Sequence, residues 1–310
     1  MKILVTGGAG FIGSHLLPQL LVDGHEVTVL DNASSGNWEN VPAECEHWEM
    51  DIRSEAVIPK IIKARFTVIV HLAAQTMVSS SQDDPQLDAA ENIMGTVNIL
   101  EAARLSDVDR IILSSTAAAY GDVPVNDLPI KESEMVKPLS FYGLSKVTAE
   151  QYIRQYQKSF GLNYVIFRFA NVYGERQGDA GEGGVISIFA KKIAKGEGIT
   201  IFGDGKQTRD FVYAGDIAAG IMAAIKTDNV NDTYNLSTQQ ETSLLELVAI
   251  MSDIKGRKIS TSFGAARTGD ILRSSLSNKK AITKLGWKPK LSLKDGLKQT
   301  MNYVKKEYKQ

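Results

Sequence analysis

Tyr142 and Lys146 are the residues of this chain whose types and spacing point most directly to chemistry. Four residues apart, they share one face if their segment is a helix. A tyrosine hydroxyl has a pKa of about 10 and is a poor base at neutral pH, but a nearby lysine ammonium favours the phenolate. Such a pair can take a proton from an alcohol hydroxyl. A tyrosine four residues before a lysine is common by chance, so this spacing indicates catalysis only if the fold places the two residues at a ligand site.

A second hydroxyl, that of Thr116, follows a short apolar run that predicts a strand over 109–115. The segment 140–160 predicts a helix that begins just before Tyr142 and also carries Lys146. Ligands of open parallel α/β sheets bind outside the carboxyl ends of the strands. We therefore predict that these three side chains form a catalytic group in which the threonine holds a substrate oxygen in line.

A glycine-rich turn near the N-terminus predicts a dinucleotide site. The sequence Lys2–Ser14 reads KILVTGGAGFIGS, with Gly7, Gly10 and Gly13 between an apolar strand and a helix that begins near Phe11. Glycines at these positions allow a tight turn, let the backbone approach a pyrophosphate and pack helix against strand. The helix N-terminus adds free N–H groups that favour an anion. A glycine-rich turn in a nucleotide-free α/β protein is the alternative, and it fits the linked pattern less well.

Asp31 closes the next predicted strand, HEVTVLD, and selects the cofactor. A carboxylate at this place accepts both ribose hydroxyls of NAD and repels the extra phosphate of NADP. No arginine or lysine occurs between Asp31 and Asn40 to receive that phosphate. The sequence therefore predicts NAD.

Composition excludes several other classes of function. The 310 residues include 35 basic and 36 acidic side chains, for a net charge of −1, so neither nucleic acid nor an anionic membrane is expected as a partner. No apolar run approaches the roughly twenty residues that span a bilayer. The single cysteine, Cys45, excludes an internal disulfide, and no charged and then apolar leader precedes the first strand, so we expect a cytoplasmic protein. The four histidines show no metal-ligand spacing, and no metal is expected.

Strands and helices alternate through five strands, which predicts an α/β fold with a Rossmann-type doubly wound parallel sheet. A sixth strand is predicted over 162–174, after which the chain changes character and contains a long glycine-rich loop. We expect a dinucleotide-binding domain over 1–170 that also receives segments from about 210–236. Residues 171–310 are expected to form mainly a smaller C-terminal α/β substrate-binding lobe.

The motifs TGGAGFIGS, HLAA, SST followed by YG, YGLSK and RFANVYG resemble the extended short-chain dehydrogenase/reductase family over nearly the whole chain. Within it they are similar to NAD-dependent epimerases and dehydratases of nucleotide sugars, of the UDP-glucose (UDP-galactose) 4-epimerase type. The resemblance implies that the catalytic group is Thr116, Tyr142 and Lys146. It also implies a UDP-sugar substrate and a homodimer formed through helices over 88–105 and 140–160.

The glycine pattern and the resemblance together assign a set of residues to the cofactor. They are Gly7, Gly10, Phe11, Ile12, Gly13, Asp31, Asn32, Ser34, Ser35, Gly36, Asp51, Ile52, Leu72, Ala73, Ala74, Gln75, Asn92, Ser114, Tyr142, Lys146 and Phe169. A second set is assigned to the nucleotide sugar. It consists of Thr116, Tyr142, Asn171, Val185, Phe202, Arg209, Arg267, Asp270 and Ser274. Arginines suit this set because a pyrophosphate binds guanidinium forks.

The residues after Thr116 indicate the reaction. In the 4,6-dehydratases of this family an Asp-Glu pair follows the threonine, and decarboxylating relatives keep a glutamate in the same segment. Here Ala117 and Ala118 follow, so a 4-keto sugar has no elimination route and takes hydride back on its other face. We predict an isomerase that interconverts UDP-glucose and UDP-galactose.

Ser274 extends this prediction to a larger sugar. By resemblance it occupies a gate beside the C2 substituent, and a small residue there leaves room for the N-acetyl group of UDP-N-acetylglucosamine and UDP-N-acetylgalactosamine. UDP-glucuronate is a weaker candidate, because Gly178 stands where uronate epimerases often carry an arginine, although Arg273 could substitute. A dTDP-sugar epimerase or reductase and a non-catalytic NAD-sensing protein are also compatible with the sequence.

Overall fold

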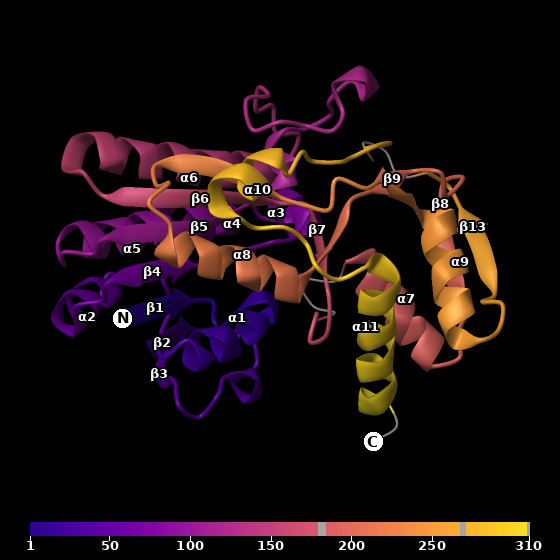
Figure 1. Ribbon diagram of the computed structural model, residues 1–310, viewed down its shortest axis with the longest axis horizontal. Helices are drawn as coiled ribbons and strands as arrows, with labels where there is room; N and C mark the ends of the chain where they lie inside the picture. The colour runs from indigo at the N-terminus through magenta and orange to yellow at the C-terminus, as the bar shows by residue number, and fades with distance from the viewer. Residues whose placement is uncertain (179–183, 267–270, 309–310) are drawn as a thin grey trace.

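The computed structural model describes residues 1–178, 184–266 and 271–308. A parallel seven-stranded sheet lies at its centre in the order β11-β6-β5-β4-β1-β2-β3, drawn on the left of Figure 1. The strands are β1 (Lys2–Thr6), β2 (Glu26–Asp31), β3 (Glu46–Glu49), β4 (Val68–His71), β5 (Arg110–Thr116), β6 (Asn163–Phe169) and β11 (Asp232–Leu236). This arrangement confirms the predicted doubly wound sheet.

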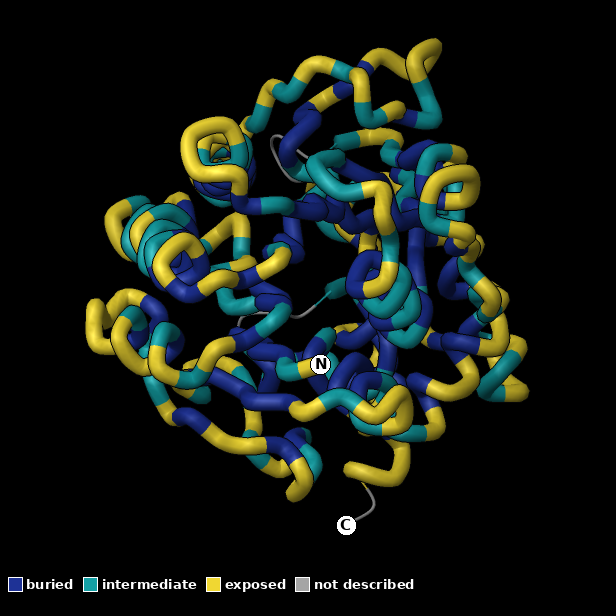
Figure 2. Tube along the Cα trace, turned by 60° about the vertical axis from the view of Figure 1, so that its left-hand side comes forward, coloured by how far each residue is buried: buried dark blue, intermediate teal, exposed yellow. Residues whose placement is uncertain are grey.

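Helices cover both faces of the sheet because its strands are apolar on both sides. On β1, Ile3 and Val5 belong to one buried core and Leu4 to the other, as the alternation of side chains along a strand requires. The first core also contains apolar side chains of α1 (Phe11–Val22) and α8 (Ala214–Lys226). The second contains those of three further helices, α2 (Val57–Ala64), α5 (Gly95–Arg104) and α6 (Phe141–Phe160). Figure 2 shows the buried strands inside the exposed outer turns of the helices.

The long helix expected after residue 84 is present as one helical run with a change of pitch. It consists of α4 (Pro85–Ala89), a π-helical segment (Ala90–Met94) and α5. Helices α4 and α5 both pack against α6, beside the edge where β5 ends. A π-bulge inside a helix is frequently found at a functional site.

The smaller lobe, on the right of Figure 1, has a third core of its own. That core contains residues of α7 (Val185–Ala194), β8 (Ile199–Phe202), α9 (Leu244–Lys255) and α11 (Leu293–Glu307). Strand β8 pairs with β13 (Thr261–Gly264) in parallel. The remaining short elements are η1 (Trp38–Asn40), α3 (Val78–Asp83), η3 (Ala117–Ala119), η4 (Val125–Asp127), β9 (Thr208–Arg209), β12 (Thr242–Ser243) and α10 (Lys279–Leu285).

The single strand predicted over 162–174 is two strands. The first, β6, ends at Phe169, and after Ala170 the chain forms β7 (Asn171–Tyr173), which pairs with β10 (Phe211–Tyr213) outside the main sheet. Hydrogen bonding at the junction explains the break: the N–H of Ala170 still donates to Leu236, but that of Asn171 donates to Asp210 instead. The chain leaves the sheet there and enters the smaller lobe.

The chain crosses between the two parts more than once, because β11 and α8 return to the central sheet after the smaller lobe has begun. The segments expected from about 210–236 and the boundary at residue 170 both stay predictions. Among the helices of the described residues, none has both the length and the hydropathy to cross a membrane.

Candidate active site

Two adjoining cavities lie where the strands of the central sheet end, and a third, in the smaller lobe, adjoins the second of them. The first is lined by the glycine turn and the ends of β2 and β4, and it shares Gly7, Gly10, Leu72 and Ala74 with the second. Nearly all of the residues predicted to bind the cofactor line one of these two cavities. The exceptions among the described residues are Gln75 and Asn92, which lie behind the cavity wall and hydrogen-bond each other.

The glycine turn has the close packing that its sequence predicts. Gly7 has a φ of +69°, and a Cβ there would lie 2.5 Å from the backbone nitrogen of Ala73. A Cβ on Gly13 would lie 2.3 Å from the carbonyl oxygen of Gly8. Side chains are therefore excluded from the turn, and the amide groups at the start of α1 stay accessible to an anion. The residues present fit the pyrophosphate of a dinucleotide.

Asp31 stands at the end of β2 on the wall of the first cavity. Burial raises the pKa of its carboxyl group, and the backbone N–H groups of Ala33 and Ala9, which donate to it at 2.8 and 3.0 Å, oppose that rise. At the far end of this cavity Arg53 holds the pKa of Asp51 down at about 2, and Asn32 donates to the same carboxylate. These carboxylates are placed to accept the hydroxyls and amine of a nucleoside.

The second cavity brings Thr116, Tyr142 and Lys146 together. Thr116 is the last residue of β5, and its Oγ1 accepts a hydrogen bond from the backbone N–H of Ala118 at 3.1 Å. Tyr142 lies in the first turn of α6, which Ser140 caps by accepting from the N–H of Gly143. The end of β5 and the start of α6 thus bring the three predicted catalytic side chains to the same cavity. Ser114 and Phe169, which are predicted to bind the cofactor, line it as well.

Lys146 is only 4% exposed, and burial lowers the pKa of its ammonium group to about 8. The carboxylates of Glu150 and Asp88 oppose this shift. Burial and the charge of Lys146 lower the pKa of His71, on β4, to about 3, so that imidazole is neutral. The site therefore contains one buried cation whose charge depends on its carboxylate neighbours.

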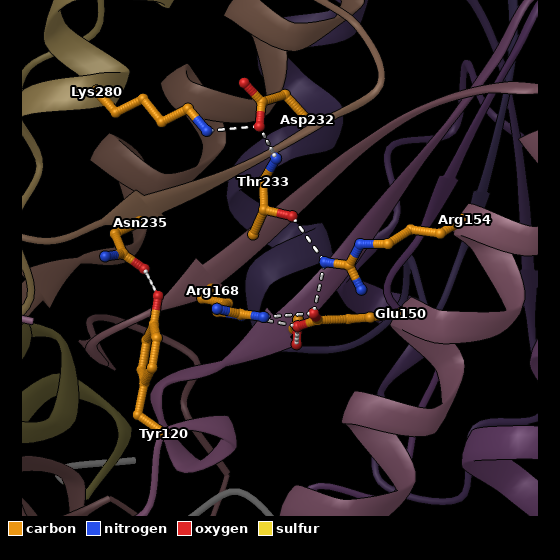
Figure 3. A network of polar contacts seen from close by, with 9 residues as sticks. Tyr120, Glu150, Arg154, Arg168, Asp232, Thr233, Asn235 and Lys280 are labelled. Carbon is orange, nitrogen blue, oxygen red and sulfur yellow. Dashed lines mark hydrogen bonds and ion pairs between the residues drawn. The ribbon is translucent and has the colours of Figure 1, made fainter. Parts of the chain in front are cut away.

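A network of buried charges fixes α6 against the sheet (Figure 3). Glu150, one turn after Lys146, accepts from Ser115 Oγ at 2.6 Å and from Arg168 Nε and Nη2 at 2.9 and 2.7 Å. Arg154 adds a second cationic partner at 3.0 Å. Because Ser115 precedes Thr116 on β5, the network sets the position of α6 relative to the predicted catalytic strand end.

The third cavity belongs to the smaller lobe and contains four of the residues predicted to bind substrate. They are Asn171, Val185, Phe202 and Arg209. Asn171 also lines the second cavity, so a ligand can extend from one cavity into the other. Arg209 is oriented by the carbonyl oxygens of Thr208 and Ile271, to which its Nη1 donates at 2.8 and 2.7 Å.

Of the remaining residues predicted to bind substrate, Thr116 and Tyr142 line the second cavity, whereas Ser274, which is half-buried, is absent from the described walls of all three. Arg267 and Asp270 lie outside the described residues. Arg273, the possible partner for a uronate, instead forms a bidentate pair with Glu241 at 2.8 and 2.6 Å.

The cavity walls also contain residues that the sequence analysis did not assign. Lys192 and Gln207 line the third cavity with Ile188, and Thr76 and Met77 line the second. The sequence could have indicated two of these residues as cavity residues, because Gln207 stands two residues before Arg209 and Thr76 follows the HLAA motif closely. Lys192 had none, since its helix is amphipathic and a lysine there resembles a solvated face. Among the described residues no group of acidic, histidine or cysteine side chains is arranged to hold a metal ion.

Comparison with known protein families identifies the family to which this chain belongs. Residues 3–237 match the model of the NAD dependent epimerase/dehydratase family. The chain belongs to this family. NAD is therefore its cofactor, in agreement with the prediction from Asp31 and the glycine turn.

Individual members of the family are similar over the full length. The UDP-glucose 4-epimerase of Mycolicibacterium smegmatis is 38% identical over 98% of this chain and 99% of its own length. A crystal structure of the UDP-glucose 4-epimerase of Thermotoga maritima with UDP-glucose has a TM-score of 0.96 and 40% identity, over 99% of this chain and 100% of that one. A crystal structure of the UDP-glucose 4-epimerase of Thermus thermophilus in complex with NAD has a TM-score of 0.92 and 37% identity, and the match covers 98% of this chain and 99% of that one.

Proposed function

We propose that this protein is an NAD-dependent UDP-sugar 4-epimerase that interconverts UDP-glucose and UDP-galactose. The observation that carries the proposal is the cavity that Thr116, Tyr142 and Lys146 line together, between the glycine turn and the cavity of the smaller lobe. A nucleotide sugar whose nucleotide lies near Arg209 and whose sugar lies near Tyr142 spans these two cavities through Asn171. The UDP-glucose 4-epimerases that are similar to this chain agree with the activity.

The proposed chemistry divides between the cofactor and the chain. When bound along the glycine turn and Asp31, NAD supplies the acceptor for a hydride from C4 of the sugar and later its donor. Tyr142 takes the proton of the C4 hydroxyl and gives it back, while Lys146 favours the phenolate that this requires. Thr116 donates a hydrogen bond to the same oxygen. The 4-keto sugar must turn over before hydride returns, which inverts C4.

The segment after Thr116 favours epimerisation over elimination. Residues 117–119 form the short helix η3 and are all alanines, so this segment offers no acid or base to remove water. A net reductase would share the catalytic group but would consume free NADH. The stoichiometry of the cofactor therefore separates these two activities.

Ser274 and Arg273 suggest which sugars are accepted. Ser274 lines none of the three described cavities, so its role as a gate comes from the family resemblance alone; by that resemblance its small side chain favours UDP-N-acetylglucosamine as a second substrate. Because Glu241 binds Nε and Nη2 of the Arg273 guanidinium, that edge is already used and is not available to a substrate carboxylate. UDP-glucuronate is therefore the less favoured substrate.

The test is to incubate the purified protein, with no added cofactor, with UDP-glucose and separately with UDP-N-acetylglucosamine, and to follow the C4 epimers by NMR. We expect UDP-galactose from the first sugar and the N-acetyl analogue from the second. In Tyr142→Phe we expect kcat to fall by roughly 10²- to 10⁴-fold. Absence of any epimer, even with NAD supplied, would contradict the proposed function. Turnover of plain UDP-glucose alone would contradict only the role of Ser274.

We also infer that the protein acts as a homodimer in the cytoplasm. Large apolar side chains are exposed along neighbouring helices that pack together, and we call this set the α4–α6 face. It consists of Leu87 on α4, Met94 on the π-helical segment, and Phe141, Leu144 and Tyr152 on α6. Cys45 is a free, buried thiol, which is compatible with a reducing compartment.

A further inference from the structure

Asp210 is a buried carboxylate that the proposed mechanism leaves without a role. It stands between β9, which ends at Arg209, and β10, and it is 1% exposed. Among the described residues four donors converge on its side chain, and all four are neutral. Oδ1 accepts from the N–H and the hydroxyl of Thr238 at 2.9 and 2.7 Å, and Oδ2 accepts from the N–H groups of Gln239 and Leu276 at 3.1 and 3.2 Å. A buried carboxylate needs partners of this kind to offset the loss of water.

The donors belong to two segments that are distant from Asp210 in the sequence. Thr238 and Gln239 follow β11, which ends at Leu236 in the central sheet, and Leu276 closes the segment 271–276. Gln239 has a φ of +60°, a left-handed conformation that is uncommon for a residue with a Cβ. Such a conformation persists only where the surrounding structure fixes it, and it is frequent at ligand sites. The hydrogen bond to Asp210 is one of the contacts that fix it.

The segment 271–276 is bound at both ends by neighbouring residues of one strand end. Arg209 Nη1 donates to the carbonyl oxygen of Ile271 at 2.7 Å, and the N–H of Leu276 donates to Asp210. The guanidinium group of Arg209 is therefore oriented by a segment whose other end is held by the Asp210 carboxylate. A shift of this segment away from β9 would also move the carbonyl group that orients the arginine.

Asp210 fixes a second predicted substrate residue through its main chain. Its carbonyl oxygen accepts from the N–H of Asn171 at 2.9 Å, at the point where β7 begins. Asn171 lines the second and third cavities, and Arg209 lines the third. One residue thus joins the two strands, β7 and β9, that bring these side chains to the cavity of the smaller lobe.

We propose that Asp210 is a positioning residue for the nucleotide end of the substrate, which holds residues 238–239 and 271–276 against β9 and so keeps Arg209 and Asn171 in their binding geometry. This role deepens the proposed epimerase function and rests on it. The proposed catalytic group is carried by β5 and α6, to which the Asp210 side chain is not bound. Loss of the carboxylate should therefore raise KM and leave kcat nearly unchanged.

The decisive variant is Asp210→Asn. It keeps the size of the side chain, but an NH₂ group replaces one oxygen and faces N–H donors that then lose their acceptor. We expect the Kd of UDP, measured by calorimetry on the protein with NAD bound, to rise by roughly tenfold. The KM for UDP-glucose should rise by a similar factor. Hydrogen exchange followed by mass spectrometry should show lost protection in 271–276 and none in α6.

Asp216→Asn is the matched control. Asp216 is also a buried carboxylate, 6% exposed on α8, and its Oδ2 accepts the main-chain N–H of Leu291 at 3.1 Å. The change leaves a buried N–H without its acceptor at a place outside the three cavities. We expect a lower melting temperature and an unchanged Kd for UDP. A folded Asp210→Asn protein with the wild-type Kd, or an equal loss of affinity in both variants, would overturn the proposal.

Two further results keep the test decisive. If Asp210→Asn does not fold, Thr238→Val replaces it, because valine keeps the branched shape and removes only the hydroxyl donor. The Kd of UDP must then still rise, by a smaller factor, and an unchanged Kd refutes the role. If the wild-type protein binds UDP but epimerises no sugar, the proposed reaction fails while the calorimetry still decides the role of Asp210. If it binds no UDP, both proposals fail.

Discussion

Lys146 illustrates how one residue can be useful to a site and harmful to the fold. Its ammonium group is buried with a pKa of about 8, well below the ordinary value of 10.5. Between these two pH values the unfolded chain binds more protons than the folded protein. Stability therefore increases as pH rises through this window, and the destabilising effect of the buried charge is complete below about pH 8.

We predict that Lys146→Met inactivates the protein but makes it more stable. Methionine keeps most of the apolar stem and removes the buried charge, so the free energy of unfolding at pH 7 should rise by roughly 1–3 kcal/mol. The gain should disappear above pH 10.5, where the wild-type lysine becomes neutral in the unfolded state as well as in the folded one. Urea unfolding at pH 7 and at high pH measures this difference. A variant that is less stable at pH 7 would show that the ammonium is net favourable in the fold.

At the level of elements, α6 is held on β5 and β6 by buried ionic contacts as well as by apolar packing. Glu150 is fully buried, and Arg168 also lies over the ring of Tyr120 at 4.7 Å (Figure 3). Removal of one partner from such a pair leaves an unmatched buried charge, whereas replacement of both by apolar residues does not.

We therefore predict strong coupling between Glu150 and Arg168. Arg168→Met alone should reduce the free energy of unfolding by roughly 3–5 kcal/mol, and the double variant Glu150→Leu, Arg168→Met by much less. Urea unfolding of both single variants and the double variant completes the cycle. Additive losses would mean that the two residues act independently. The double variant should also have a low kcat, because Ser115 loses its acceptor beside Thr116.

The same elements show what the sequence could and could not predict. Local patterns were sufficient for the strands and helices, since glycine spacing and apolar periodicity mark β1, α1 and α6. They do not reveal the break after Phe169, because it depends on Asp210, a residue far along the chain whose carbonyl receives the N–H of Asn171. Lys192 and Met77 escape prediction for a related reason. Their presence in a cavity depends on packing between segments and leaves no local pattern.

At the scale of the whole molecule, the two parts are interdependent because the chain returns to the sheet. Strand β11 pairs with β6 along its full length, and α8 covers the apolar face of α1. A fragment over 1–170 would lack both. We predict that this fragment aggregates or unfolds without a cooperative transition, as measured by circular dichroism during heating. A fragment that melts cooperatively and binds NAD would show that the predicted domain is autonomous.

The proposed dimer also concerns the whole molecule, and its test uses the α4–α6 face. Leu144 is 50% exposed on that face, so a second copy related by a two-fold axis would bury it against the same helices. We predict that Leu144→Asp converts the protein to a monomer in size-exclusion chromatography with light scattering. Phe263→Asp is the control, because Phe263 is 60% exposed but lies on β13 in the other lobe, and that variant should stay dimeric.

The outcome also bears on activity, because Leu144 lies between Tyr142 and Lys146, the two residues of α6 that we propose to be catalytic. A partner that packs against one side of this helix stabilises the turn that presents Tyr142 and Lys146 on its other side. We therefore expect kcat to fall in Leu144→Asp while the control keeps the wild-type value. A monomeric wild-type protein would refute the dimer, and a dimeric Leu144→Asp protein would assign the interface to another surface. Full activity in a monomeric variant would show that α6 needs no partner, because its buried contacts with Ser115 and Arg168 hold it in place.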